Sequence, residues 1–164
     1  MSATIYLGLG SNLGDRSSLL KHACQELQHL PLKDFQESSI YESEPYQGME
    51  QPLYYNQVVR GMTSLTPRQL LETCLEIEKR LGRKREYRWE SRLIDIDILY
   101  YDDLVLDSEE LIIPHHDLVN RGFFLLPLFE LAPDWTDPRA QQTVDRLLQH
   151  WKARASEPMP VCIH

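Results

Sequence analysis

The chain has 164 residues, 42% of them hydrophobic and 26% charged, and its formal net charge is −8 at pH 7. This length is enough for one domain with a buried core and leaves little room for a second domain. The negative charge argues against a general binder of nucleic acid or of anionic membranes, because such a protein needs a basic surface. The most apolar stretch, residues 122–133, is too short to cross a membrane and is interrupted by Pro127.

The N-terminal segment and the cysteines both favour a cytoplasmic protein. Residues 1–15 have no basic region and no cleavage site after an apolar block, so we expect no secretory signal. Cys24, Cys74 and Cys162 are widely spaced and odd in number, which fits neither a disulfide framework nor a zinc knuckle. Cys24 and Cys74 fall within helical patterns, and we expect both thiols to lie in the core of a reduced protein.

The chain begins with a β-rich run at residues 4–9 that leads into the segment "GLGSNLGD". Gly10, Asn12 and Gly14 tolerate positive φ in a turn, and Asp15 can cap the helix that follows. Glycines after a strand can also leave backbone N–H groups available to a phosphate. Because the P-loop lysine and the dinucleotide-binding spacing are both missing, we favour a tight strand-to-helix turn.

Hydrophobic periodicity predicts the other elements. Up to residue 101 we expect a helix at 17–30, strands at 35–45 and 54–64, a helix at 67–81 and a strand at 93–101. The second of these helices has clear end signals: Thr66 is its N-cap, Pro67 takes its first helical position and Gly82 ends it. Beyond residue 101 we expect one or two edge strands in 104–114, a short helix in 115–133, a closing helix at 145–154 and an unstructured tail. Pro127 should lie near the first turn of the short helix or at a kink.

The order β-α-β-β-α-β predicts a ferredoxin-like α+β fold, an α/β sandwich in which helices pack on the faces of an antiparallel sheet. We expect one domain over residues 1–164, with the two helices of this repeat on the same face of the sheet. Because this fold serves many unrelated functions, the function has to be argued from particular side chains.

Basic residues are concentrated in one short segment of this acidic chain. Residues 79–92 contain seven Lys or Arg and two Glu, a local charge of +5, which leaves −13 for the remainder. A concentrated basic patch suits a small polyanion better than a long one. The pattern therefore favours a nucleotide or a phosphate ester as a ligand.

Two aspartates interrupt the apolar strand predicted at residues 93–101. Asp95 and Asp97 are two residues apart and should share one face of that strand, while the isoleucines beside them enter the core. Adjacent carboxylates repel unless a cation lies between them, and Mg²⁺ binds one or two carboxylates together with water and phosphate oxygens. A solvated strand face is the usual alternative for such a pair. The arginines just upstream favour a metal and polyphosphate site instead.

Two further segments hold candidate binding residues. Tyr54 and Asn56 should share one side of a strand, where an aromatic ring and an amide suit a flat heterocycle, although cross-strand packing is the commoner role. The segment "IPHHDLVNRGFFLL" contains His115 and His116. Adjacent histidines can be metal ligands, phosphate donors or surface residues, and on their own we favour the surface.

Taken together, these segments resemble a known family. "GLGSNLGD", "IYESEP", "YYNQVV", "RW..R..DIDIL" and "IPHHDL..RGFFLLPLFELAP" occur in the order and spacing of 6-hydroxymethyl-7,8-dihydropterin pyrophosphokinase, an enzyme of folate biosynthesis, over about residues 4–135. The resemblance implies transfer of pyrophosphate from ATP, the co-substrate, to the hydroxymethyl group of the pterin, with release of AMP. It implies two Mg²⁺ ions, and we expect a monomer that binds neither nucleic acid nor membranes.

The resemblance also implies roles for individual positions. Asp95 and Asp97 match the pair that holds the Mg²⁺ ions. The ATP-binding positions are Glu78, Arg83, Arg85, Trp89, Arg92 and His115, and the catalytic ones are Arg83, Arg92, Asp95 and Asp97. The basic positions meet the polyphosphate, and Trp89 belongs to a mobile loop that closes over it. The pterin-binding positions are Ser43, Glu44, Tyr46, Tyr54, Asn56, Arg121 and Phe123. Tyr54 and Phe123 would sandwich the ring, whose edge Asn56 reads.

Three alternatives remain at this stage. Glu90, Glu110 and His116 differ from the residues usual at the matching positions, which leaves open a non-catalytic or substrate-shifted paralogue that binds nucleotide or pterin. A ferredoxin-like RNA-binding module conflicts with the acidic charge and with the lack of a basic and aromatic sheet motif. For a nucleotide-sugar transferase with a DxD motif, 164 residues look too few.

Overall fold

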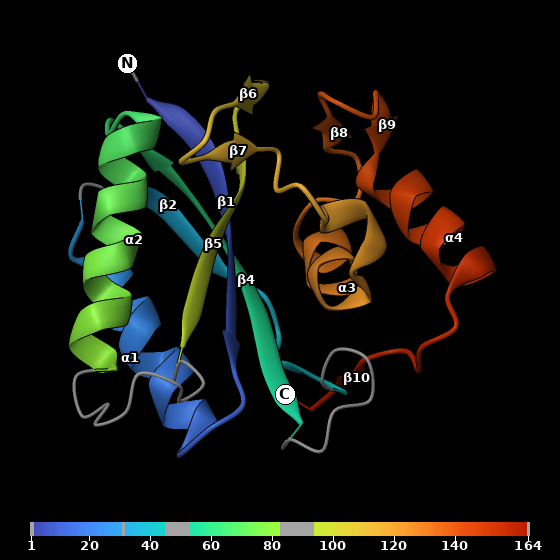
Figure 1. Cartoon of the computed structure of the whole chain (residues 1–164), viewed down its shortest axis with the longest axis horizontal. Helices are drawn as coiled ribbons and strands as arrows, with labels where there is room; N and C mark the ends of the chain where they lie inside the picture. The colour runs from blue at the N-terminus through green and yellow to red at the C-terminus, as the bar shows by residue number, and fades with distance from the viewer. Residues whose placement is uncertain (1, 31, 45–52, 83–93, 164) are drawn as a thin grey trace.

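The computed structural model describes residues 2–30, 32–44, 53–82 and 94–163 (Figure 1). The strands are β1 (Ala3–Ser11), β2 (Leu32–Glu37), β3 (Tyr41–Ser43), β4 (Tyr54–Thr63), β5 (Asp95–Tyr101), β6 (Leu106–Asp107), β7 (Ile112–Ile113), β8 (Thr136–Asp137), β9 (Gln142–Thr143) and β10 (Val161–Cys162). The helices are α1 (Arg16–Gln28), α2 (Pro67–Leu81), the 3-10 helix η2 (Leu118–Asn120), α3 (Gly122–Leu131) and α4 (Val144–Arg154). The central sheet lies between two helix layers, with α1 and α2 on one face and α3 and α4 on the other.

The sheet has the predicted ferredoxin-like arrangement. Its order is β10-β3-β4-β1-β5, with β2 also paired to β4, and every described pairing is antiparallel. The nine residues of β1 pair with β4 on one side, and most of them pair with β5 on the other. The prediction of an α+β sandwich is confirmed, and β1 lies inside the sheet between β4 and β5.

The strand predicted at residues 35–45 is divided into β2 and β3. At the break, Ser38 Oγ accepts a hydrogen bond from the Val58 backbone N–H at 2.9 Å, in the place where a ladder carbonyl would accept it. The Ser38 carbonyl accepts from the Gln57 side chain at 2.9 Å. Side-chain hydrogen bonds therefore satisfy the backbone where the chain bends, which hydrophobic periodicity does not reveal.

The layer of α1 and α2 packs as predicted. Cys24 and Cys74 are buried in the core, and so are Ile94, Ile96 and Ile98, which alternate with the aspartates of β5. At the start of α2, the Thr66 hydroxyl accepts from the Gln69 N–H and the Gln69 side chain accepts from the Thr66 N–H. This reciprocal cap satisfies two backbone donors at the helix start.

The opposite layer is a second apolar cluster built around aromatic rings. Tyr6, Tyr100 and Trp135 contact one another with centroids 4.9–6.0 Å apart, and Trp151 of α4 packs against Gly122 at the start of α3. Pro127 lies in the middle of α3, so of the two places expected for it, the first turn of the helix is excluded. The proline costs one intrahelical hydrogen bond, and its buried apolar ring contributes packing instead.

The tail predicted to be unstructured contains β10, so this prediction was wrong. Val161 and Cys162 pair with β3, and the Ile163 N–H donates to the Ile40 carbonyl at 2.9 Å. An edge strand of two residues carries almost no sequence signal, because its hydrogen bonds join backbone groups. Across the ranges described, no helix is long and apolar enough to span a membrane.

Replacement of Gly122 by alanine tests the contact between α3 and α4. A Cβ at this position would overlap the buried Trp151 ring, so Gly122→Ala should lower the free energy of unfolding by about 1–3 kcal/mol, as overpacking does. Gly61→Ala is the matched control, because its nearest neighbouring atom would lie 3.6 Å from the new Cβ. Urea unfolding should show the control unchanged or slightly stabilised. Equal effects of both variants would contradict the packing argument.

Candidate active site

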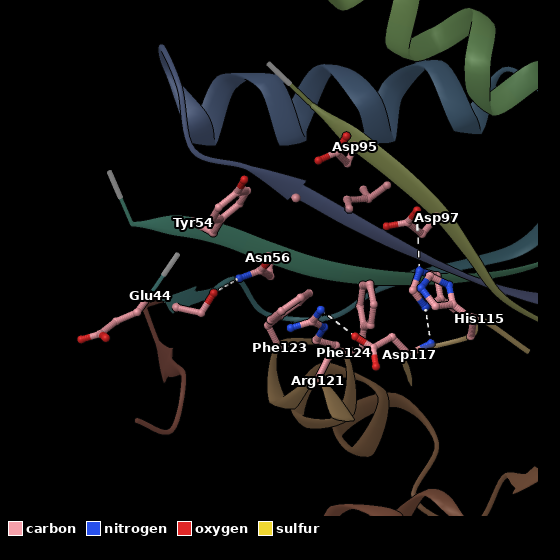
Figure 2. Close-up of a pocket in the computed structure, with 14 residues that line it drawn as sticks. Glu44, Tyr54, Asn56, Asp95, Asp97, His115, Asp117, Arg121, Phe123 and Phe124 are labelled. Atoms are coloured by element: carbon pink, nitrogen blue, oxygen red, sulfur yellow. Dashed lines mark hydrogen bonds and ion pairs between the residues drawn. The ribbon is translucent and has the colours of Figure 1, made fainter. Parts of the chain in front are cut away.

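A pocket of about 240 Å³ opens between the sheet and the segment that leads into α3 (Figure 2). Strands β1, β3, β4 and β5 form one wall, and residues 115–124 form the other. The lining residues are Leu9, Gly10, Ser43, Glu44, Tyr54, Asn56, Asp95, Asp97, His115, His116, Asp117, Arg121, Phe123 and Phe124. Nine of the positions that the sequence singled out as binding residues thus meet in one cavity.

Two glycines of β1 leave room on this face of the sheet, Gly10 for the pocket and Gly8 for the Phe124 ring that lines it. Gly10 is paired with Asn56 on β4 and with Asp95 on β5, and Gly8 is paired with Asp97. Cross-strand partners share a face, so both glycines lie on the face of the sheet that carries the amide and the carboxylates, and Gly10 lines the pocket. A Cβ on Gly10 would lie 3.3 Å from Asn56 Oδ1, and one on Gly8 would lie 2.6 Å from the Phe124 ring.

Gly8 lies in the first strand, as predicted, whereas the position of Gly10 differs from its prediction. Gly10 was expected in a turn, but it lies within β1, and among the glycines described only Gly14 has positive φ, at 65°. The helix cap was predicted correctly, because Asp15 accepts from the Ser18 N–H at 3.1 Å. The alternation Gly-Leu-Gly inside a strand was the signal for a face without side chains.

Asp95 and Asp97 project from β5 into the pocket, as their spacing predicted (Figure 2). Burial, together with the Asp95 charge, raises the pKa of Tyr54, so this phenol is neutral at pH 7. The described residues contain no group of three or more His, Cys, Asp or Glu side chains arranged to hold a metal ion. Any metal bound here would have to complete its coordination with ligand oxygens or water.

His115 faces Asp97 as a neutral imidazole. Burial is the main cause that lowers the pKa of His115 to about 4, and the adjacent His116 lowers it further. His115 Nδ1 accepts the Asp117 N–H at 3.1 Å, so its own proton is on Nε2, which lies 4.0 Å from Asp97 Oδ1. At pH 7 the contact therefore lies between a neutral imidazole N–H and the Asp97 carboxylate, and it is not an ion pair.

Asp117, which the sequence analysis did not select, organises the wall opposite the sheet. Its carboxylate forms an ion pair with Arg121 at 2.6 Å and accepts from the Asn120 amide at 2.8 Å. The Arg121 guanidinium lies 5.9 Å from the centroid of the Phe123 ring. The aspartate therefore holds the arginine beside an aromatic ring of the pocket. Its spacing of four residues from Arg121 was the available signal.

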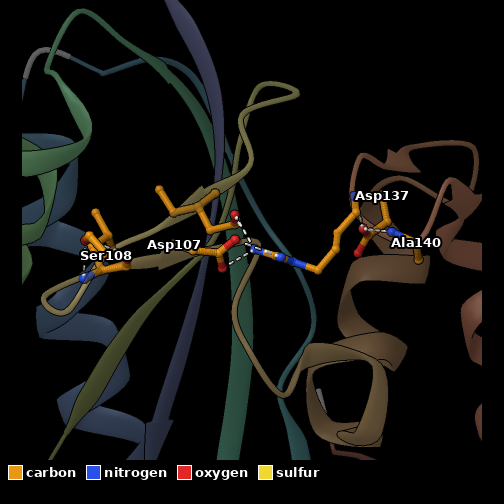
Figure 3. Close-up of polar contacts among 7 residues, drawn as sticks. Asp107, Ser108, Asp137 and Ala140 are labelled. Carbon is orange, nitrogen blue, oxygen red and sulfur yellow. Dashed lines mark hydrogen bonds and ion pairs between the residues drawn. The ribbon is translucent and has the colours of Figure 1, made fainter.

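The segment that carries this wall is also held from outside the pocket (Figure 3). Arg139 donates to both carboxylate oxygens of Asp107 on β6, at 3.2 and 2.9 Å, and to the Ile113 carbonyl on β7 at 3.1 Å. Asp137 is buried and accepts from the Tyr100 hydroxyl at 2.7 Å. These contacts join the β8–β9 hairpin to the strands that precede His115.

Glu78 is the described candidate that does not line the pocket. Its carboxylate accepts the Ile96 N–H at 2.8 Å, at the edge of β5 between the two aspartates. The side chain thus binds the backbone of the strand that carries them. Glu110 pairs with Arg68 at 3.0 Å, away from the pocket. The remaining candidates lie outside the described residues, namely Tyr46, Arg83, Arg85, Trp89 and Arg92.

Fold and pocket together define a ferredoxin-like α+β protein with an aromatic, amide and carboxylate site on one face of its sheet. The sequence model of the family "7,8-dihydro-6-hydroxymethylpterin-pyrophosphokinase (HPPK)" matches residues 6–133. The chain belongs to this family.

Individual relatives agree with this assignment. The chain is 44% identical over 130 residues to the 2-amino-4-hydroxy-6-hydroxymethyldihydropteridine pyrophosphokinase of Methylorubrum extorquens, covering 79% of this chain and 82% of that one. It is 42% identical over 136 residues to the protein of the same name from Aquifex aeolicus, covering 83% and 84%.

The fold is similar to that of a larger protein of known structure. The Plasmodium falciparum HPPK-DHPS A437G structure with SDX-DHP superposes with a TM-score of 0.74 at 17% identity. The match covers 94% of this chain and 46% of the Plasmodium chain, so this chain spans less than half of that protein. At this identity, the likeness establishes the fold.

A double-mutant cycle on Asp117 and Arg121 tests how strongly the wall is held. Their side chains are only 24% and 20% exposed, so the coupling free energy should reach about 1 kcal/mol or more. Arg68 and Glu72 form the matched control, because they are also four residues apart but are 71% and 64% exposed. That pair should couple by about 0.5 kcal/mol or less in thermal unfolding. Equal coupling in both pairs would contradict the buried-wall argument.

Proposed function

We propose that the protein transfers pyrophosphate from ATP to the hydroxymethyl group of 6-hydroxymethyl-7,8-dihydropterin, a step of folate biosynthesis. The observation that carries the proposal is the pocket of this HPPK-family chain. It combines a buried amide, two aromatic side chains and a pair of carboxylates on one face of the sheet. The half of the pocket with the amide and the aromatic rings suits a flat polar heterocycle. The half with the carboxylates suits a metal-bound polyphosphate.

The pterin would bind on the side of β3 and β4. Tyr54 comes from the sheet and Phe123 from α3, and we propose that their rings sandwich the heterocycle while Asn56 reads its edge (Figure 2). Ser43 and Glu44 would add backbone hydrogen bonds, as would Tyr46 outside the described ranges. Arg121, already held by Asp117, would contribute positive charge beside the ring.

ATP would bind on the side of β5. Asp95 and Asp97 offer oxygen donors that fit Mg²⁺, and two such ions would neutralise charge on the phosphates. His115, which is neutral, can donate its Nε2 proton toward the same region. Glu78 would support this side through its hydrogen bond to β5. We also assign the polyphosphate to Arg83, Arg85 and Arg92 and to Trp89 of the same segment, and all four lie outside the described residues.

The reaction requires positioning more than covalent participation by the protein. The pterin hydroxymethyl oxygen would form a bond to the β-phosphorus of ATP as the bond between that phosphorus and the α,β-bridging oxygen breaks, so AMP leaves. Such a transfer depends on in-line placement and on neutralised phosphate charge. The geometry of the pocket supports this proposal, because Gly10 is paired with Asn56 on β4 and with Asp95 on β5, so the amide and the carboxylates lie on the same face of the sheet. We further propose a monomeric, cytoplasmic, single-domain enzyme that binds neither nucleic acid nor membranes.

Release of AMP is the direct test of this function. Purified protein with ATP, Mg²⁺ and 6-hydroxymethyl-7,8-dihydropterin should release AMP in amounts equal to the pyrophosphorylated pterin formed. If both ligands bind by calorimetry but no AMP appears, the protein is a non-catalytic paralogue. Activity that survives complete removal of divalent cations by a chelator would contradict the Mg²⁺ assignment.

Replacement of Asp97 by asparagine tests the carboxylate pair. Asp97→Asn should lower kcat roughly 100-fold or more, the scale of losing one electrostatic group that stabilises a transition state. Its melting temperature without ligands should remain close to that of the wild type, because two adjacent carboxylates repel. Asp103→Asn is the control, since Asp103 is exposed and does not line the active-site pocket. Near-normal turnover by Asp97→Asn would contradict the metal site and would favour the interpretation of the pair as a solvated strand face.

Replacement of Phe123 by alanine tests the aromatic sandwich. The variant should weaken pterin binding by about 1–3 kcal/mol, by analogy with the stacking of a base on an aromatic side chain. Its affinity for ATP should hardly change. Phe129→Ala is the matched control, because Phe129 lies on the same helix but is 38% exposed. Calorimetric titrations with each ligand separate the outcomes, and equal losses for both ligands would show that Phe123 acts through the fold.

A further inference from the structure

The Asn56 amide is fixed by an edge strand before any ligand arrives. Asn56 is 4% exposed, and its Nδ2 donates to Ser43 Oγ at 2.7 Å and to the Tyr41 carbonyl at 3.4 Å. Both acceptors belong to β3, which pairs with β4 beside Asn56. Both hydrogen bonds of the amide nitrogen are therefore directed to the same neighbouring strand.

The Tyr41 carbonyl determines which way the amide faces. A serine hydroxyl can donate or accept, so Ser43 alone would tolerate either orientation of Asn56. A backbone carbonyl can only accept, and a reversed amide would place two oxygens against each other. The nitrogen must therefore face β3.

This orientation leaves Oδ1 as the polar atom that Asn56 offers to a ligand. A Cβ on Gly10 would lie 3.3 Å from Oδ1, so the missing side chain of Gly10 keeps the space beside this oxygen open. Gly10 and Ser43 line the pocket together with Asn56, which is labelled in Figure 2. An oxygen in this position accepts hydrogen bonds and cannot donate them.

We propose that the Ser43 hydroxyl is a positioning residue for substrate recognition. Its short hydrogen bond holds the Asn56 amide in place, in the orientation that the Tyr41 carbonyl selects, so that Oδ1 points into the pocket and selects heterocycles that present an N–H donor at that edge. The inference rests on the proposed function, because it takes the pterin as the occupant of this half of the pocket. It assigns the selectivity to a side chain of β3 in addition to the backbone groups of that strand.

Ser43→Ala removes the hydroxyl and keeps the backbone of β3. Binding of 6-hydroxymethyl-7,8-dihydropterin, measured by calorimetry with Mg²⁺ and α,β-methylene-ATP present, should weaken about tenfold, equivalent to about 1.4 kcal/mol. Binding of α,β-methylene-ATP itself should be unchanged. In the AMP assay, the KM for pterin should rise while kcat stays nearly constant. Ser43→Thr keeps a hydroxyl and should restore most of the affinity.

A double-mutant cycle distinguishes positioning from general support of the fold. If Ser43 acts through Asn56, Ser43→Ala in an Asn56→Ala background should change pterin affinity by less than about twofold. Ser38→Ala is the matched control, because this buried hydroxyl binds the Val58 N–H of the same strand, β4. The control should keep wild-type affinity for pterin even if it is less stable.

The outcomes separate this inference from the proposed function. Wild-type protein that binds no pterin would overturn both. Wild-type turnover together with unchanged pterin affinity in Ser43→Ala would overturn only the positioning role. Additive losses of pterin affinity in the cycle, or equal losses of affinity for pterin and α,β-methylene-ATP, would show that Ser43 supports the fold. Either result would also overturn the positioning role.

Discussion

The pocket depends on the absence of side chains at two positions of β1: Gly10 lines the cavity, and a Cβ on Gly8 would overlap the ring of Phe124, which also lines it. The strand lies inside the sheet, with α1 and α2 packed on one face and the pocket on the other. On the first face it carries Ile5, Leu7 and Leu9, which are buried in the core. Successive side chains of a strand point to opposite faces of the sheet. The sequence Gly-Leu-Gly therefore places a leucine on the core face and leaves the opposite face without side chains.

The groups around this pocket come from separate parts of the chain. Strand β4 contributes an aromatic ring and an amide, and strand β5 contributes two carboxylates. The sheet fixes their separation through backbone hydrogen bonds, so the side chains need no contact with one another. A site built on paired strands is positioned more accurately than one built on loops.

The wall opposite the sheet is held by polar contacts. His115 and Arg121 both depend on Asp117, through its backbone N–H and its carboxylate respectively. Arg139 ties the strands before this segment to the C-terminal hairpin. These hydrogen bonds and ion pairs fix the conformation of a segment with little regular structure. Apolar packing is less directional and would define that conformation less well.

The sequence by itself determined whatever depends on near neighbours along the chain. Periodicity and capping signals located both helices of the repeat, the buried isoleucines of β5 and the shared face of Asp95 and Asp97. Motif spacing was specific enough to indicate the family. Only the tertiary structure decided the break at Ser38, the edge strand β10 and the hydrogen bond between Ser43 and Asn56. Each of these depends on a partner more than ten residues away, and hydrogen bonds between distant backbone and side-chain groups leave no periodic trace in the sequence.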